Sequence, residues 1–240
     1  HAHSVAGSIF DAIGYPDEHM DFCYENGGEA LALTDHGNMN GFSHQFLHWQ
    51  KMKSEGKEFK PIFGVEAYFL PSIDEWRDDY NRIKEDAKLA KTLAKEGDTS
   101  GATVEDEAAS KKAVKNVLNR RRHLVLLAQN QTGLNNLFKL ISESYKEENF
   151  YRYPRVDYKL LDKYSEGVIA SSACLGGPYA GNYWANREEG PEAVREAMRE
   201  TSRRFVEIFG DRWYGELQWN NIPEQHELNQ YIIETCKEFD

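Results

Sequence analysis

The first and third residues of the chain are histidines, and further residues of metal-binding types recur along the sequence. Side chains at positions i and i+2 of an extended strand point to the same face, so His1 and His3 can reach one ion together if this segment is a strand. The other candidates are His36, Glu66, His123 and Cys174. Imidazole, carboxylate and thiolate groups are the usual protein ligands of zinc and related ions, and the sequence therefore predicts a metal site.

Short apolar runs alternate along the chain with stretches of helical periodicity. The apolar runs predict buried strands at 30–34, 61–65, 124–128, 167–171 and 213–217. The intervening stretches predict helices at 17–26, 41–54, 133–145, 192–209 and 223–240. This alternation is typical of an α/β fold with parallel strands and right-handed crossovers. With the opening segment there are about six strands, one or two fewer than a closed barrel needs.

Several candidate ligands lie at the ends of predicted strands. Asp35 and His36 follow one predicted strand, Glu66 ends the next, and Cys174 follows a later one. In a parallel α/β barrel the carboxyl ends of the strands lie on one face, so these side chains would converge there. Each residue alone is weak evidence, but their joint placement favours a metal site. Alternation turns Asp35 away from His36, so we expect Asp35 to form structural hydrogen bonds rather than to bind metal.

The composition is that of a single acidic domain. The chain has 240 residues, 40% of them hydrophobic, which suffices for one large core. Its formal net charge of -11 argues against a protein whose main role is to grip phosphate backbones, so a nucleic acid substrate would depend on metal ions. The three cysteines have no regular spacing, which predicts a reducing, cytoplasmic location. The sequence contains no signal peptide and no apolar run of membrane-spanning length.

Both ends of the sequence suggest a piece of a longer protein. The chain starts on a candidate ligand rather than on methionine. It stops after the helix predicted at 223–240, where an α/β fold would continue with a strand. We therefore expect the last strand to be missing from this chain.

Several segments share the order and spacing of a known family. They are His1-Ala2-His3-Ser4 with Asp11, residues 30–39, 60–68, 123–133, 136–137 and 167–176, Tyr153-Pro154-Arg155-Val156-Asp157, and Pro223-Glu224-Gln225. These segments resemble the polymerase and histidinol phosphatase (PHP) domain family, in the form found at the amino terminus of bacterial replicative DNA polymerase III alpha subunits. The resemblance runs over nearly the whole chain. It implies the PHP fold, a distorted (β/α)7 barrel of the TIM type, as one domain over residues 1–240.

The resemblance also implies a cluster of two or three divalent ions. The implied ligands are His1, His3, Asp11, His36, Glu66, His123 and Cys174. Among them, Glu66, His36 and Asp11 are the implied catalytic residues, although the loop before Asp11 is one residue longer than in the family. Two further family ligands, an Asp-x-His pair, would lie beyond Asp240. Zinc, manganese or iron would suit this set, and Cys174 favours zinc at one position.

Two features lie outside the implied metal cluster. Arg155 belongs to a matching segment, and we expect it to contact phosphate or DNA, the alternative being a salt bridge to a carboxylate. A charged stretch around 74–122 is longer than the family leads us to expect. Its Lys, Glu and Ala content predicts a solvated insertion, with exposed helix around a loop at 97–101.

Three functions are compatible with the resemblance. The first is a metal-dependent phosphoesterase module of a replicative DNA polymerase, a 3'-5' exonuclease that hydrolyses phosphodiester bonds at a DNA 3' end, with the remainder of the polymerase chain as its partner. The second is a structural or interaction module that binds metal only for stability. The third is a free-standing small-molecule phosphatase, which the polymerase-like segments at 154–157 and 223–225 disfavour.

Overall fold

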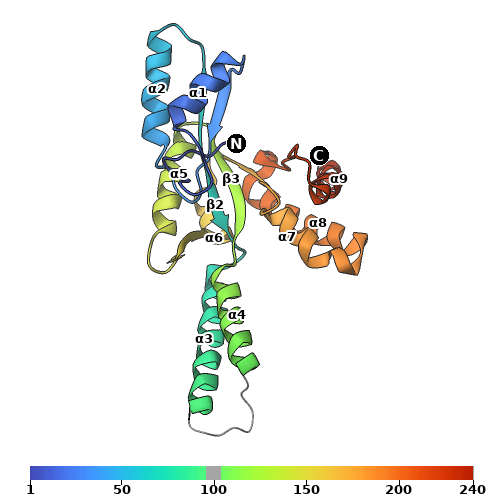
Figure 1. Ribbon diagram of the computed structural model, residues 1–240. Coiled ribbons are helices and arrows are strands. Elements are labelled where there is room, and N and C mark those ends of the chain that lie inside the picture. The colour runs from blue at the N-terminus through green and yellow to red at the C-terminus, as the bar shows by residue number, and fades with distance from the viewer. Residues whose placement is uncertain (96–103, 240) are drawn as a thin grey trace. The chain divides into compact units, whose positions relative to one another are not determined.

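A mixed sheet organises most of the chain (Figure 1). Its strands are β1 (Ala30–Leu33), β2 (Lys60–Phe69), β3 (Arg122–Ala128), β4 (Phe150–Tyr151), β5 (Tyr153–Val156), β6 (Val168–Ser171) and β7 (Trp213–Tyr214). This computed structural model describes residues 1–95 and 104–239, so the loop predicted at 97–101 lies outside the described residues. The predicted strands correspond to β1, β2, β3, β6 and β7, whereas the short strands β4 and β5 were not predicted.

β3 runs antiparallel to both of its neighbours. β2 pairs in parallel with β1 and β5, and β6 pairs in parallel with β7, but the β2–β3 and β3–β6 pairs are antiparallel. The expectation of a wholly parallel sheet is therefore wrong. The reason lies in the connection: Phe69 and Arg122 lie opposite each other, so the chain leaves and re-enters the sheet at the same end rather than crossing over a helix.

The strands that the structure describes do not close into the expected TIM-like barrel. They follow the order β4-β5-β2-β3-β6-β7, and β1 pairs with β2 beside this path. Ala2 extends the sheet beyond β1 through an isolated parallel bridge to Leu33. The fold is thus α/β, with an open mixed sheet among the described residues.

The chain divides into two compact units, residues 1–69 with 122–240, and residues 70–121. The first unit contains α1 (Pro16–Glu25), α2 (Phe42–Ser54), α5 (Gln131–Ser144), α6 (Tyr158–Lys163), α7 (Pro178–Asn186), α8 (Pro191–Phe209) and α9 (Pro223–Glu238). Proline in the first turn begins α1, α7, α8 and α9, where its missing N–H costs no helical hydrogen bond. The five predicted helices are confirmed to within about two residues. The shorter α6 and α7 were not predicted.

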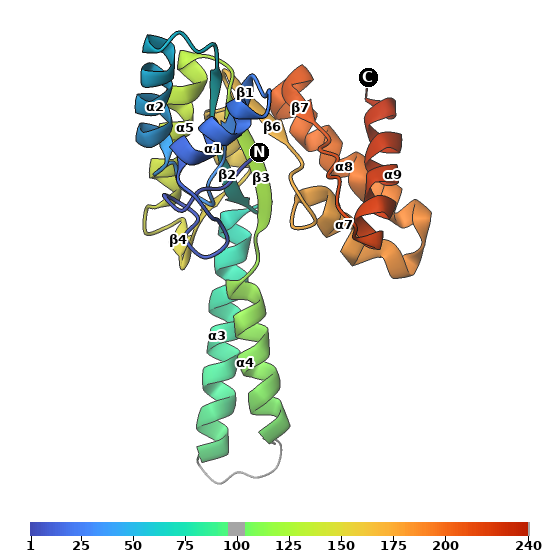
Figure 2. The same ribbon diagram turned by 45° about the horizontal axis from the view of Figure 1, so that its top comes forward.

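The hydrophobic core fixes the strands against helices α5 and α8. Leu126 of β3, Leu137 of α5 and Phe205 of α8 belong to one cluster of fully buried side chains. A second cluster joins α7, α8 and α9 through residues such as Met198 and Ile232, and Figure 2 shows these three helices grouped together. Because burial of such side chains is the main stabilising term of a domain, the strands that carry polar residues are held in place by their apolar neighbours.

The second unit consists, in its described part, of α3 (Ile73–Lys95) and α4 (Val104–Leu118), which lie side by side (Figure 1). The indole of Trp76 donates a hydrogen bond of 2.8 Å to the Val117 carbonyl, and Arg120 forms an ion pair of 2.6 Å with Asp79. These two helices agree with the helical structure that the charged composition of this stretch predicts.

No helix within the described ranges combines the length and the apolar character that crossing a bilayer requires.

Candidate metal centre

The register of the strands places the opening histidines and Glu66 on one face of the sheet. Ala2 lies opposite Leu33, and Leu33 lies opposite Phe63 of β2. Since side chains alternate along a strand, the two residues that flank Ala2 share a face with the residue three positions after Phe63, which is Glu66. The predicted strand-like arrangement of His1 and His3 is thereby confirmed.

His36 and His123 reach the same face from two other strands. His36 lies opposite Glu66 in an isolated parallel bridge just beyond β1. His123 lies opposite Tyr68, two residues after Glu66, because β3 runs antiparallel to β2 and brings its first residues to the last residues of that strand. The sequence predicts that Glu66 ends its strand, but β2 continues to Phe69, so Glu66 lies inside the strand.

The chain turns sharply after His36 at a residue that must be glycine. Gly37 has a φ of +66°, and a Cβ there would lie 2.9 Å from Pro154 Cγ and 3.0 Å from a ring carbon of Tyr68. Left-handed backbone is unfavourable for residues that carry a Cβ, and this position also lacks the space for one. Gly37 therefore allows His36 to face Glu66 while β5 packs close behind it.

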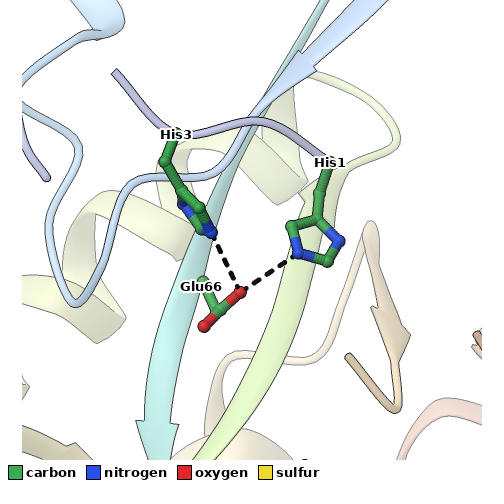
Figure 3. A group of neighbouring side chains, drawn as sticks. All are labelled: His1, His3 and Glu66. Carbon is green, nitrogen blue, oxygen red and sulfur yellow. Dashed lines mark ion pairs between the residues drawn. The ribbon is translucent and has the colours of Figure 1, made fainter. Parts of the chain in front are cut away.

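The Glu66 carboxylate is the centre of the site. Its side chain is 1% exposed and lies within ion-pair distance of four imidazoles. Oε2 is 3.2 Å from His1 Nε2 and 3.5 Å from His3 Nε2, and Figure 3 shows both rings directed at this oxygen. Oε1 is 3.1 Å from His36 Nδ1 and also contacts His123 Nδ1. Each oxygen thus faces its own pair of histidines.

These contacts define two groups of potential metal ligands that share one carboxylate. In the described residues, the ligand atoms of His1, His3 and Glu66 all lie within 4.8 Å of one another, and so do those of His36, Glu66 and His123. The two groups are adjacent, since the rings of His3 and His36 stack at a centroid distance of 4.1 Å. Five of the seven predicted ligands are therefore brought together.

The two remaining predicted ligands each contact one member of the groups. Asp11 lies in the opening loop, with Oδ2 2.8 Å from His36 Nε2, and its side chain is 55% exposed. Cys174 follows β6, with Sγ 3.5 Å from His123 Nδ1, and its sulfur also accepts a hydrogen bond from the backbone N–H of Gly176. Asp11 and Cys174 thus lie at the edges of the site, beside different histidines.

Burial and charged neighbours shift the pKa values of several residues in the site. Burial raises the pKa of the Glu66 carboxyl, but the imidazoles of His1, His123 and His36 outweigh burial and leave it well below its ordinary value. Burial lowers the pKa of His1, but the carboxylates of Glu216 and Glu66 overcome this and raise it to about 10. For His123, contacts with Cys174 and Glu66 overcome burial and raise the pKa to about 9. The site therefore stabilises positive charge around one buried carboxylate.

The donor set fits divalent metal ions. Both Glu66 oxygens and His36 Nδ1 are buried, and within the described residues they have no hydrogen-bond partner of acceptable geometry. Buried polar atoms are nearly always satisfied, and a divalent ion could satisfy a set of ligand-type atoms that lie so close together. His3 is prepared for this role, because its Nδ1 lies 2.8 Å from the Thr34 carbonyl and leaves Nε2 to face Glu66.

Asp35 has the structural role that its position predicted. It is buried, and its carboxylate accepts hydrogen bonds from the Ser4 backbone N–H at 2.6 Å and from the hydroxyls of Ser4 and Ser8 at 2.9 Å. These bonds tie the loop after His3 to the end of β1. Asp35 therefore orients the segment that carries the first two histidines.

The predicted contact of Arg155 with phosphate or DNA does not fit its position. The side chain is 0% exposed, and its Nη1 donates hydrogen bonds to the carbonyls of Tyr151 and Tyr153 at 2.8 and 3.1 Å. A fully buried guanidinium cannot reach a substrate on the surface. The hydrogen bonds show that Arg155 holds the β4–β5 turn.

Sequence reasoning missed one residue of the site, Glu216. It follows β7, and its Oε1 lies 2.7 Å from His1 Nδ1. A signal was present in the sequence, because Glu216 is the charged residue within the apolar run at 213–217. That run was interpreted only as a buried strand, and β7 in fact ends at Tyr214.

The chain belongs to the PHP domain family, whose sequence profile matches residues 1–220. The resemblance found in the sequence is thereby confirmed. The chain is 38% identical over 233 residues to the DNA polymerase III subunit alpha of Aquifex aeolicus. The aligned residues cover 97% of this chain and 16% of that protein. It is 35% identical over 208 residues to the DNA polymerase III subunit alpha of Borreliella burgdorferi, covering 87% of this chain and 14% of that protein.

Another DNA polymerase III alpha subunit shows a similar level of identity. The DNA polymerase III subunit alpha of Campylobacter jejuni is 33% identical over 220 residues, covering 89% of this chain and 14% of that protein. The chain thus spans 14 to 16% of the length of these relatives. A solved structure from Bifidobacterium adolescentis aligns over 98% of this chain and 82% of its own at 13% identity, with a TM-score of 0.39.

Proposed function

We propose that the protein is a metal-dependent phosphoesterase module of a replicative DNA polymerase, which hydrolyses phosphodiester bonds at a DNA 3' end as a 3'-5' exonuclease. The observation that carries this proposal is the shared carboxylate of Glu66, which belongs to both groups of potential ligands. A bridging carboxylate holds two ions close together, the arrangement suited to in-line displacement at phosphorus. The similarity to DNA polymerase III alpha subunits supports the choice of DNA as substrate.

The chain's own residues divide the work of holding the ions. His1 and His3 would bind one ion and His36 and His123 the second, with Glu66 contacting both. Asp11 lies beside His36 and Cys174 beside His123, so each would add a ligand to the group formed by His36, Glu66 and His123. The thiolate favours zinc, whereas manganese or iron suits the imidazole and carboxylate positions.

Bound divalent ions would supply a nucleophilic water at neutral pH and electrostatic stabilisation of the departing oxygen. The residues around them supply the fixed geometry. Glu66 is buried and its strand is locked into the core, so its two oxygens cannot move apart from the histidines they face. Asp11, by contrast, is exposed and lies on the opening loop, where it can orient a water molecule or a substrate hydroxyl.

The overall charge of the chain also favours metal-dependent binding of the substrate. With a formal net charge of -11, the protein repels a nucleic acid backbone. A cluster of divalent ions over Glu66 would supply local positive charge. We therefore expect DNA to bind at the metal centre and nowhere else on the described surface with comparable affinity.

A second candidate function is a structural module within the polymerase. The observation that favours it is the origin of the ligands, because His1 with His3, His36, Glu66 and His123 come from four separate segments of the sheet. Ions bound between them would stabilise the fold without any hydrolysis. Activity of the metal-loaded protein distinguishes the two functions.

The test combines metal content with nuclease activity. Protein purified without chelator or metal affinity resin is analysed by elemental mass spectrometry, and then incubated with 3'-labelled single-stranded DNA in the presence of zinc, manganese or iron. We expect two or more ions per chain and release of the labelled nucleotide. The matched variants are Glu66→Gln and, as a control outside the site, Glu143→Gln, whose carboxylate pairs with Lys146.

The outcomes separate the alternatives. Loss of activity in Glu66→Gln but not in Glu143→Gln supports the exonuclease. Two bound ions without nucleotide release support the structural module. Equal activity in Glu66→Gln and in the unmodified protein identifies a contaminating nuclease and overturns the proposal.

A further inference from the structure

We propose that Glu216 is a positioning residue of the metal centre, which holds the imidazole of His1 so that its Nε2 is presented to the ion. This inference rests on the proposed metal-dependent function. Glu216 does not belong to either group of potential ligands among the described residues. Glu216 would act on the metal centre only through its contact with His1.

The two nitrogens of the His1 ring face two different carboxylates. Nδ1 lies 2.7 Å from Glu216 Oε1, and Nε2 lies 3.2 Å from Glu66 Oε2. When Nε2 binds an ion, the remaining ring proton resides on Nδ1, and Glu216 is placed to accept a hydrogen bond from this N–H group. Carboxylate groups behind metal-bound histidines fix the tautomer and the ring orientation and increase the basicity of the ligand.

Glu216 is itself held in place by several contacts. The hydroxyl of Ser171 donates to its Oε2 at 2.6 Å, and Gln218 Nε2 donates to its Oε1 at 3.3 Å. The backbone N–H of Glu216 donates to the hydroxyl of Ser172 at 2.9 Å. A carboxylate fixed at both its oxygens and its backbone can orient a neighbour, because it has little freedom to move away.

The anchoring residues connect Glu216 to the opposite side of the site. Ser171 ends β6, and the same segment continues to Cys174, which contacts His123. Through Glu216 the end of β6 is therefore linked to His1, on the far side of Glu66. The position of the first histidine depends on this link.

The comparison with His3 shows why His1 needs a side chain for this purpose. His3 Nδ1 lies 2.8 Å from the backbone carbonyl of Thr34, so the strand itself orients that ring. His1 precedes the bridge at Ala2, and its Nδ1 faces the side chain of Glu216. The backbone fixes the orientation of the His3 ring. A single substitution, at Glu216, removes the group that orients the His1 ring.

The experiment measures zinc affinity and the state of the His1 ring. Glu216→Ala removes the acceptor, whereas Glu216→Gln keeps an oxygen acceptor of the same reach. The control is Glu227→Ala, because Glu227 accepts a hydrogen bond of 2.6 Å from Tyr183 outside the site. Zinc affinity is measured by competition with a chromophoric chelator. The Nδ1–H proton of His1 is followed by NMR in the zinc-loaded, histidine-labelled protein and assigned by its absence in His1→Gln.

We expect Glu216→Ala to weaken zinc binding by about 10- to 100-fold and to abolish the protected Nδ1–H signal, the usual scale for loss of such a partner. Glu216→Gln should recover most of the affinity and the signal, and Glu227→Ala should match the unmodified protein. If Glu216→Ala does not fold, Glu216→Gln and the NMR signal of the unmodified protein decide: a zinc-loaded His1 without a protected Nδ1–H overturns the proposal.

Failure of the inference differs from failure of the proposed function. If the unmodified protein binds no zinc, manganese or iron, the metal-dependent function is wrong, and this inference with it. If the unmodified protein binds zinc and folded Glu216→Ala binds it equally well, only the role of Glu216 is overturned.

Discussion

Glu66 and His36 are opposite residues of an isolated parallel bridge, and their side chains meet with Glu66 Oε1 3.1 Å from His36 Nδ1. These two residues are therefore joined both by backbone pairing and by a side-chain contact. Because the bridge fixes the spacing of the two Cα atoms, the contact requires no adjustment of the loop that carries His36. The rest of the site is arranged around this pair, with His3 stacked on His36 and His123 approaching from β3.

Removal of ligands should reduce the metal content in steps. His3→Ala affects only one group and His123→Ala only the other, so each should lose about one ion per chain, whereas Glu66→Ala should lose both. Elemental analysis of the purified variants measures this directly. The control is His48→Ala, because His48 pairs with Asp21 away from the site. Retention of both ions in Glu66→Ala would falsify the shared-carboxylate arrangement.

Gly37→Ala should destabilise the protein more than Gly27→Ala. Both glycines have positive φ, +66° and +82°, and each substitution should cost about 1–2 kcal/mol for the left-handed backbone. A Cβ at Gly37 also meets Pro154 Cγ at 2.9 Å, whereas nothing lies within 4 Å of one at Gly27. Overpacking should add about 1 kcal/mol or more. Urea unfolding of the two variants gives the comparison, and equal free energies of unfolding would contradict it.

The stability of the metal-free protein should fall as the pH rises above 6.5. The pKa values of His1 and His123 are raised from 6.5 to about 10 and about 9 in the folded chain. A raised pKa stabilises the fold fully below the unfolded value, and this contribution is lost as the pH passes through the folded value. Urea unfolding after chelator treatment, at pH 6.5 and about 9, measures the decline.

The carboxylate partner provides the control for this pH dependence. Glu66→Gln removes the negative charge that both histidines face, so its free energy of unfolding should vary less between the same two pH values. The lowered pKa of Glu66 acts in the opposite range, since its stabilisation is present above its ordinary pKa of 4.5 and is lost as the pH falls. An equal decline in Glu66→Gln would show that other groups cause it.

The metal centre should survive removal of the second unit. Phe69 and Arg122 are partners in the antiparallel β2–β3 pair, so replacing residues 70–121 with Asn-Gly would close a two-residue hairpin at the same register. We expect the shortened protein to bind as many ions per chain as the complete one. Elemental analysis together with the circular dichroism spectrum tests this. A folded but metal-free product would show that the second unit contributes to binding.

Sequence reasoning identified most of the side chains that gather around Glu66 because their local signals are strong. The His1-x-His3 spacing and the residues that follow apolar runs indicate a metal site without any knowledge of strand order. His123 is different, because it directly precedes its predicted strand and would lie at the wrong end of a parallel sheet. Its place in the site depends on the antiparallel direction of β3, which is set by a connection of more than fifty residues and which no local pattern encodes.

The errors have physical reasons of the same kind. Arg155 carries a charge that usually indicates a surface, but its guanidinium is buried and donates hydrogen bonds to backbone carbonyls of the β4–β5 turn. Glu216 was missed because its contact with the site is made through His1, which is far away in the sequence. Burial and partner identity are properties of the assembled sheet, and composition alone does not determine them.

The wide separation of the ligands along the chain has one more consequence. An ion shared by His3, Glu66 and their neighbours would act as a cross-link that closes loops tens of residues long in the unfolded chain. Such closures reduce the entropy of the unfolded state in the same way that a disulfide does, and longer loops contribute slowly more. Loss of metal would then shorten the lifetime of the folded chain as well as its activity. Treatment with a chelator should therefore lower the free energy of unfolding as well as remove the proposed activity.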